Sequence, residues 1–423
     1  MFEANNPEFT SWIEVAPSSD FPIQNIPFGI FRTPEKSPRM ASIIGDTVID
    51  LNVMANMEMF DLSESQRKVF SERYINDFMA LGKTVTRQVR VRISEIFRHD
   101  NAELRDNEEL KQAILHNVNE VELLMPIKVG DYTDFYSSRE HATNVGTMFR
   151  DPDNALLPNW LHLPVGYHGR ASSIVVSGTA IKRPKGQQMP ANAEKPVYGP
   201  CKLLDFELEM AFVVGTGTQL GDTISTANAE DHIFGVCLFN DWSARDIQKW
   251  EYVPLGPFLG KSFASSISPW IVTLDALDPF RISGPEQEPE VLSYLKYEGN
   301  RRFDLDLEVQ IKPENGEAHT VCRSNFKYMY WNMSQQLAHH SVNGCNFNPG
   351  DMCASGTISG TTPDSFGSML ELAWRGTKPI PMPDGTERKF ILDGDTVIMK
   401  GHGVRNGVRI GFGEVSGKVL PAD

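Results

Sequence analysis

One stretch, Leu203–Val214 (LLDFELEMAFVV), alternates acidic with apolar side chains and constrains the fold of this chain more than any other feature. Successive side chains of a β-strand point to opposite faces, so Asp205, Glu207 and Glu209 share one face and apolar side chains occupy the other. Like charges along one face repel each other, so these acids must face either water or a cation. Two interpretations are open from this stretch alone: a half-exposed strand with a solvated acidic face, and a metal site.

The spacing of the three acids limits how many of them can bind one ion. Neighbouring acids on one strand face lie ~6.6 Å apart, close enough to converge on an ion, whereas the first and third lie ~13 Å apart. We therefore expect at most two of the three to be ligands of a single ion. Carboxylate oxygen atoms favour calcium or magnesium over zinc.

Length and charge narrow the class of protein. A chain of 423 residues is long enough for about two or three domains with a large core. Its 55 acidic against 40 basic residues, a formal charge of −15, argue against nucleic acid or an anionic membrane as a partner. Apolar runs stay below the roughly 18 residues that a membrane span requires, so we expect none.

The cysteine pattern and the N-terminal residues bear on the cell compartment. The five cysteines include no C-x-x-C pair, which disfavours a disulfide scaffold or a thiolate metal site and fits a reducing cytosol. Residues Met1–Ser19 show no basic segment followed by an apolar run, so we expect no secretory signal. These features predict a cytoplasmic protein.

The first third of the chain reads as short strands followed by helices. Gly45-Asp46 between two β-branched runs predicts a hairpin over residues 41–50. Three helices are then expected: one from a capping box at Ser63 and Gln66 to Gly82, one with an apolar stripe over 85–97, and one capped by Asp106 with Glu109. Pro126 breaks this pattern, so we predict domains at 1–126 and 127–423.

Beyond this boundary, short apolar runs alternate with turn residues, which predicts a large β-rich domain. The expected strands cover residues 173–176, 203–214, 233–239, 270–274, 305–311, 390–398 and 408–419. One helix is expected at about 333–342, ending near Gly344.

Polar clusters at the ends of these runs could carry chemistry. Asp134 and Tyr136 precede His141, whose imidazole suits general base catalysis, although a loop histidine is usually structural. Asp241 follows a strand, and Arg245 and Gln248 come next, spaced by three positions. The alternative there is a helix-capping aspartate followed by solvated side chains.

Two further charged residues stand among apolar neighbours. Lys261 lies between a glycine and an apolar run, so its backbone is expected to be held in place. Glu371 lies in the apolar segment Met369–Trp374, where a carboxylate needs a partner or a raised pKa. The alternative for Glu371 is a buried structural ion pair.

Taken in order, these segments resemble the fumarylacetoacetate hydrolase family, from about Pro22 to the C-terminus. The resemblance rests on DYTDFYSSREHATNVGTMFR, LPVGYHGRASS, DFELEMAF, NDWSARDIQKWEY, PLGPFLGKSF, and ASGTISG followed by GSMLELAW. It implies a mainly β fold with some α, in which an N-terminal SH3-like β-barrel domain with helices precedes a C-terminal mixed β-sandwich roll. It also implies a homodimer.

The resemblance also implies the site residues. Calcium ligands match Asp134, Glu207, Glu209 and Asp241, and a magnesium site matches Asp241, Lys261 and Ser265. Ser265 stands where the family often has threonine. A water-activating dyad matches His141 and Glu371, and the groups around the leaving carbanion match Arg245, Gln248 and Lys261. Substrate contacts match Tyr136, Arg150, Tyr167, Gln248, Tyr252 and Thr357.

The activity implied is hydrolysis of a carbon–carbon bond of 4-fumarylacetoacetate to fumarate and acetoacetate, the last step of tyrosine and phenylalanine catabolism. One alternative is a related hydrolase or decarboxylase of a smaller 2,4-dioxo acid. Two features argue against it: the complete dyad of His141 and Glu371, and the long N-terminal domain. The other is a calcium-stabilised β-protein that only binds ligands, which explains the carboxylates but not the matching His, Glu, Arg and Lys.

Overall fold

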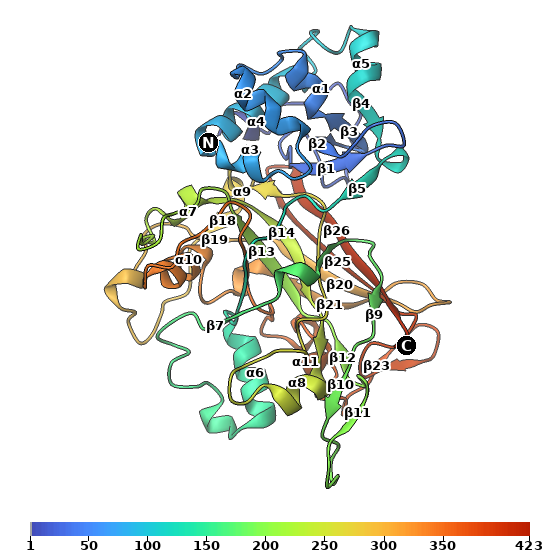
Figure 1. Cartoon of the computed structure of the whole chain (residues 1–423), viewed down its shortest axis with the longest axis vertical. Coiled ribbons are helices and arrows are strands. Elements are labelled where there is room, and N and C mark those ends of the chain that lie inside the picture. The colour runs from blue at the N-terminus through green and yellow to red at the C-terminus, as the bar shows by residue number, and fades with distance from the viewer. Residues whose placement is uncertain (1) are drawn as a thin grey trace.

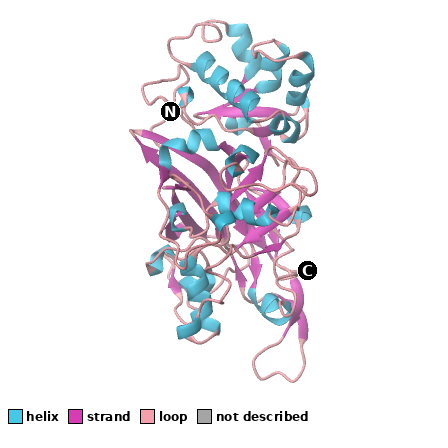
Figure 2. Ribbon diagram, turned by 90° about the vertical axis from the view of Figure 1, so that its left-hand side faces the viewer, coloured by secondary structure: helices cyan, strands magenta, loops and turns pink. Residues whose placement is uncertain are grey.

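The computed structural model describes residues 2–423. A smaller N-terminal part rich in helices packs on one end of a larger part rich in strands (Figures 1 and 2). Phe28 and Ile271 exchange backbone hydrogen bonds of 3.0 and 2.8 Å across the contact between the two parts. The fold class predicted from the sequence, mainly β with some α, is confirmed, and the division at 126/127 stays a prediction.

The N-terminal part is built on an antiparallel sheet of five strands in the order β4-β3-β2-β1-β5. These strands are β1 (Gly29–Arg32), β2 (Arg39–Ile44), β3 (Thr47–Asp50), β4 (Leu115–Asn117) and β5 (Glu122–Leu124). The predicted hairpin is confirmed, because β2 and β3 pair around a two-residue turn. Its first residue, Gly45, has a φ of +57°, a conformation that glycine adopts without strain.

Five helices cover this sheet, and the helix predicted from Ser63 to Gly82 is not continuous. They are α1 (Leu51–Asn56), α2 (Glu64–Arg67), α3 (Asn76–Ala80), α4 (Lys83–Phe97) and α5 (Glu108–Ile114). Ser63 and Gln66 form the predicted capping box, but the chain is extended at Glu72 instead of helical to Gly82. Because of this break, the centroids of the buried Phe70 and Phe78 rings lie 5.4 Å apart. In one continuous helix the two residues would be ~12 Å apart along the axis.

The apolar stripe over 85–97 lies on α4, as predicted, and Val89, Ile93 and Phe97 are buried. The cap of α5 was predicted one residue too early. Asn107, and not Asp106, accepts the hydrogen bond from the Leu110 amide, at 3.1 Å. Asparagine is as good a cap as aspartate, so the sequence pattern does not separate the two positions.

The larger part has two main sheets. The first runs β7-β6-β22-β13-β14-β16-β8, with β17 paired to β14. Its strands are β6 (Tyr132–Phe135), β7 (Gly166–His168), β8 (Ile174–Val176), β13 (Leu208–Val214), β14 (Ile233–Asp241), β16 (Ser265–Ile267), β17 (Val272–Thr273) and β22 (Met352–Ala354). The second runs β21-β20-β25-β26-β9. Its strands are β9 (Ile181–Lys182), β20 (Asp306–Lys312), β21 (His319–Asn325), β25 (Thr396–Arg405) and β26 (Val408–Leu420).

Short two-stranded ladders and helices complete this part. The ladders pair β10 (Lys185–Gln188) with β11 (Val197–Pro200), β12 (Leu204–Asp205) with β15 (Ser243–Ala244), β18 (Arg281–Ile282) with β19 (Arg302–Phe303), and β23 (Ile380–Pro381) with β24 (Glu387–Arg388). The helices are α6 (Arg139–Phe149), α7 (Ala229–His232), α8 (Arg245–Glu251), α9 (Leu274–Leu277), α10 (Met333–Ser341) and α11 (Met369–Leu372). The predicted helix at about 333–342 is therefore confirmed as α10.

Strand β13 is buried on both faces, which excludes the solvated acidic face considered for Leu203–Val214. Leu208 and Met210 pack in the core shared with the second sheet, and Ala211 and Val213 pack in the core shared with the N-terminal part. The stretch is also not one continuous strand. It divides into β12 and β13, with Phe206 and Glu207 between them.

Two other strands differ from their predicted ranges. Leu274 begins α9 and does not end a strand, because the Thr273 side chain caps that helix. The strand expected at 390–398 begins only at Thr396, since a turn with Gly394 at a φ of +87° precedes it. Within residues 2–423, no helix combines the length and the apolar character needed to cross a membrane.

Candidate active site

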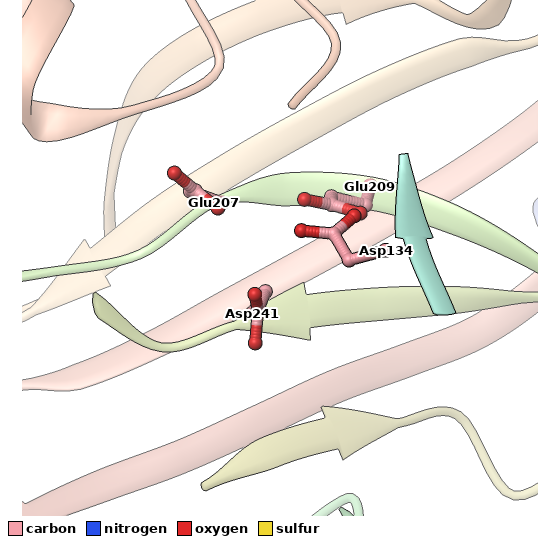
Figure 3. A group of neighbouring side chains, drawn as sticks. All are labelled: Asp134, Glu207, Glu209 and Asp241. Atoms are coloured by element: carbon pink, nitrogen blue, oxygen red, sulfur yellow. The ribbon is translucent and has the colours of Figure 1, made fainter. Parts of the chain in front are cut away.

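Four buried carboxylates meet where neighbouring strands of the large sheet end. Asp134 lies on β6, Glu209 on β13, Glu207 just before β13, and Asp241 at the end of β14. One oxygen atom from each residue can be chosen so that all four atoms lie within 4.8 Å of one another (Figure 3). Asp205, the third acid of the alternating stretch, is not part of this group.

The electrostatics of this cluster fit a bound cation. Burial, together with the neighbouring carboxylates, raises the pKa of both Asp134 and Glu209 well above their usual range. Asp134 Oδ1 and Glu209 Oε1 are buried and have no hydrogen-bond partner. An oxygen-only donor set with unpaired buried oxygen atoms is the chemistry of a hard divalent ion, so calcium or magnesium would fit here.

Two basic side chains neutralise part of the cluster. Lys261 Nζ forms ion pairs with Glu207 Oε2 and, at 3.0 Å, with Asp241 Oδ2. Arg245 Nη2 lies 2.8 Å from Glu207 Oε1. Burial raises the pKa of Glu207, but Lys261 and Arg245 outweigh this effect and hold it at about 2. Lys261 itself has a raised pKa, because Asp241 and Glu207 more than offset its burial.

Asp241 also accepts hydrogen bonds from two hydroxyl groups. The hydroxyl groups of Ser265 and Tyr167 donate to Oδ1 and Oδ2 of Asp241 at 2.9 and 2.8 Å. Ser265 thus presents its hydroxyl group to Asp241, and the magnesium site expected at these residues stays a prediction. A cavity of about 450 Å³ opens beside Asp241, Lys261 and Ser265.

His141 and Glu371 are brought together from two helices that begin in the same way. Ser138 caps α6 and accepts from the His141 amide, and Ser368 caps α11 and accepts from the Glu371 amide, both at 3.3 Å. Each residue of the pair thus occupies the third position of a serine-capped helix. His141 Nδ1 lies 2.7 Å from Glu371 Oε2.

Glu371 is the centre of a buried hydrogen-bond network. Besides His141, its carboxylate accepts from Asn144 Nδ2 at 2.9 Å, Ser359 Oγ at 2.9 and 3.0 Å, and Ser368 Oγ at 2.8 Å. No arginine or lysine pairs with it in the described chain, so the alternative of a structural ion pair is wrong. Burial raises its pKa, but His141 and the other donors outweigh this effect and lower it.

These contacts define the tautomer of His141. A carboxylate with a lowered pKa only accepts hydrogen bonds at neutral pH, so Nδ1 of His141 carries the proton of this contact. Nε2 is then the ring nitrogen left to exchange a proton with a molecule in the cavity. The Tyr136 ring meets the imidazole edge-on, with centroids 5.2 Å apart, and restricts its rotation.

A cavity of about 530 Å³ connects the dyad with the basic groups. His141, Arg245 and Lys261 line it, together with Asp134 and Glu207 of the carboxylate cluster. All six residues expected to contact substrate also line it: Tyr136, Arg150, Tyr167, Gln248, Tyr252 and Thr357. Glu371 lies behind His141, outside the cavity wall.

Sequence reasoning did not single out roles for several polar residues of this site. Asn144 and Ser359 bind Glu371, and Gly356 donates its amide to Glu209 Oε2 at 3.0 Å. The S-x-x-E pattern of a capping box could have identified Ser368. Asn144 and Ser359 leave no comparable pattern, because both act across the fold.

Comparison with known proteins gives the same result for both parts of the chain. Residues 24–126 match the fumarylacetoacetase N-terminal family, and residues 131–419 match the fumarylacetoacetate hydrolase C-terminal family. Fumarylacetoacetase of Bos taurus is 56% identical over 414 residues, covering 97% of this chain and 99% of that protein. The Homo sapiens protein is 55% identical over the same length, and the Dictyostelium discoideum protein 54% over 419 residues.

A solved structure shares the fold at much lower identity. The fumarylacetoacetate hydrolase of psychrophilic Exiguobacterium antarcticum superposes with a TM-score of 0.54 and 18% identity, covering 94% of this chain and 99% of that one. The family models together span most of the chain, and the relatives match it almost from end to end. This chain therefore belongs to the fumarylacetoacetase family.

Proposed function

We propose that this protein hydrolyses 4-fumarylacetoacetate to fumarate and acetoacetate, the last step of tyrosine and phenylalanine catabolism. One observation carries the proposal. His141, held from behind by Glu371, shares a cavity with Arg245 and Lys261, so a base and two cations face the space where a substrate would bind. The relatives named fumarylacetoacetase support the choice of substrate.

His141 performs the first proton transfer. Its Nε2 takes a proton from water, and the oxygen of that water adds to the carbonyl carbon of the fumaryl group, which becomes the second carboxyl group of fumarate. Glu371 keeps Nδ1 protonated and stabilises the imidazolium that forms. Three further donors to Glu371 hold its carboxylate in place without help from solvent.

Collapse of the tetrahedral adduct breaks the carbon–carbon bond. The electron pair of that bond leaves with the acetoacetate fragment as an enolate, which then takes the proton back and becomes acetoacetate. Arg245, Lys261 and Gln248 line this part of the cavity and meet the developing negative charge. Arg245 Nη1 donates to Gln248 Oε1 at 3.3 Å, which leaves the Gln248 amide nitrogen free to donate to the substrate.

Metal sites are part of the proposal. Asp134, Glu207, Glu209 and Asp241 would hold calcium, and the unpaired oxygen atoms of Asp134 and Glu209 support this assignment. Asp241 and Ser265 would hold magnesium, to which Lys261 could add only its backbone carbonyl, because its raised pKa keeps the side chain protonated. Calcium, when bound, would supply Lewis-acid polarisation of the substrate carbonyl. Tyr136, Arg150, Tyr167, Tyr252 and Thr357 are proposed to orient the two carboxylate ends of the substrate.

We also propose a cytoplasmic homodimer. Exposed apolar side chains follow α8, where Leu255 is 95% and Phe258 66% exposed, and such groups favour an interface. The five free cysteines are consistent with a reducing compartment.

Turnover of the named substrate tests the proposal. The purified protein is mixed with fumarylacetoacetate, the loss of its ultraviolet absorbance is followed, and the products are identified by proton NMR. We expect fumarate and acetoacetate in equal amounts. Cleavage of a smaller 2,4-dioxo acid with no cleavage of fumarylacetoacetate would favour the related hydrolase or decarboxylase. Binding of calcium without turnover of either compound would leave only a ligand-binding protein.

A further inference from the structure

Asp205 is a fully buried acid that neither the metal cluster nor the cavity wall uses. Its Oδ1 accepts from the Met369 amide at 2.7 Å, and its Oδ2 accepts from the Leu370 amide at 3.0 Å. These are the first two amides of α11, whose third residue is Glu371. Asp205 therefore binds the start of the helix that carries the acid of the dyad.

The same carboxylate also binds the arginine assigned to the leaving group. Arg245 Nε donates to Asp205 Oδ2 at 2.8 Å, while Nη2 of the same guanidinium lies 2.8 Å from Glu207. The ladder of β12 with β15 places Asp205 opposite Ser243, two residues before Arg245. Without Asp205, Glu207 would be the only carboxylate holding this guanidinium, and it would draw the side chain toward the carboxylate cluster.

We propose that Asp205 is a positioning residue that fixes Glu371 and Arg245 in one geometry relative to each other. This inference rests on the proposed function, since it assigns Asp205 to the support of that reaction. Two otherwise separate groups are connected through one carboxylate: the His141–Glu371 dyad by way of the α11 backbone, and Arg245 by way of its Nε. Asp205 does not line the cavity, so it acts on the substrate only through these partners.

The test compares Asp205→Asn with a matched substitution outside the site. Asp395→Asn is the control, because Asp395 is 1% exposed, holds Arg388 through both carboxylate oxygens at 2.8 and 2.9 Å, and accepts from the Leu392 amide at 2.9 Å. Both variants lose one buried carboxylate with the same kinds of partner. We expect both to melt at a lower temperature, but only Asp205→Asn to lose kcat.

For Asp205→Asn we expect kcat to fall by about 10²-fold, which is the loss of rate that a displacement of a reacting group by ~1 Å causes. KM should change much less. The loss should shrink when Asp205→Asn is combined with Arg245→Lys or with Glu371→Gln, because part of what Asp205 supports is then already missing. A purely structural role predicts the same fold-loss in every background. A kcat within twofold of wild type, together with the melting behaviour of Asp395→Asn, would overturn the proposal.

Two additions keep the test decisive. If Asp205→Asn does not fold, Asp205→Glu replaces it, because this variant keeps the charge but displaces the carboxylate. Asp205→Glu should remain folded and have a lower kcat. A wild-type kcat in Asp205→Glu would contradict the proposal. Hydrogen exchange of the peptide 367–373 needs no turnover, and it should accelerate in Asp205→Asn. If wild type does not cleave fumarylacetoacetate, the proposed function fails, and unchanged exchange in this peptide separately refutes the link between Asp205 and α11.

Discussion

Nδ1 of His141 lies 2.7 Å from Oε2 of Glu371, although the two residues are 230 positions apart in the chain. Each stands in the first turn of a short serine-capped helix, so two local motifs set the side-chain directions and the sheet between them sets the distance. Because the carboxylate only accepts at neutral pH, this contact orients the imidazole as a base toward the cavity.

Substitution of Glu371 by glutamine should affect chemistry more than binding. The amide can present a donor to His141 and support the wrong tautomer, and the equivalent change in a serine protease triad costs ~10⁴ in kcat. We expect a loss of about 10² to 10⁴ in kcat with a small change in KM. Steady-state kinetics on the purified variant measures this. A variant with normal kcat would remove Glu371 from the mechanism.

The pH dependence of stability should report the ionisation of Glu371. Its pKa is lowered in the folded protein, so the stability it contributes is present above its unfolded pKa of about 4.5 and is lost as the pH falls through the folded value. The difference in unfolding free energy between wild type and Glu371→Gln should therefore be constant near neutrality and shrink below about pH 4.5. Urea titrations from pH 7 to pH 3 test this. If the difference in unfolding free energy grew as the pH was lowered, the pKa of Glu371 would be raised in the folded protein and not lowered.

Loss of the α11 cap should lower both stability and activity. Ser368→Ala removes a helix cap, which costs about 1 kcal/mol, and also a hydrogen bond to the Glu371 carboxylate. Asn332→Ala is the control, because Asn332 caps α10 outside the site. Both variants should lose similar unfolding free energy in urea, while only Ser368→Ala loses kcat. Equal kcat values would show that the cap does not support the dyad.

Lys261→Met should separate the role of Lys261 in catalysis from its effect on calcium. Removal of a charge that meets the leaving enolate should lower kcat by roughly 10²-fold, as loss of one oxyanion-hole donor does. The variant also removes the positive charge that is paired with Glu207 and Asp241. Calcium binding should become stronger, because the carboxylate cluster is then more negative. Kinetics and calorimetry on one preparation measure both. Weaker calcium binding would show that Lys261 helps to hold the ion.

Calcium should stabilise the protein through Glu209. At a calcium concentration 100 times its Kd, a bound ion adds about 2.7 kcal/mol to the unfolding free energy, and a chelator removes it. Glu209→Gln should abolish most of this difference, since Glu209 Oε1 has no other partner. Glu308→Gln, on the solvent side of β20, is the control and should keep the calcium effect. If calcium raised the unfolding free energy of Glu209→Gln as much as that of wild type, Glu209 would not be a calcium ligand.

Local patterns determined much of this protein. The period of two in Leu203–Val214 correctly separated Glu207 and Glu209 from the apolar core positions, because strand geometry repeats every second residue. An apolar stripe located α4, and the glycine near the end of the predicted helix at about 333–342 located the end of α10, each within a few positions, because both signals act within one or two turns of a helix. The family motifs named the residues that the fold gathers around the cavity.

Other features of the protein depend on tertiary contacts, which local sequence patterns do not predict. The helix predicted from Ser63 to Gly82 is interrupted at Glu72, and the interruption lets the rings of Phe70 and Phe78 pack together, a tertiary contact that local helix propensity does not contain. Asp205 has the same local pattern as Glu207 and Glu209, yet it binds Arg245 and the start of α11 instead of joining the carboxylate cluster. That choice depends on which strand and helix lie opposite, and their arrangement is set by contacts between residues far apart in the chain.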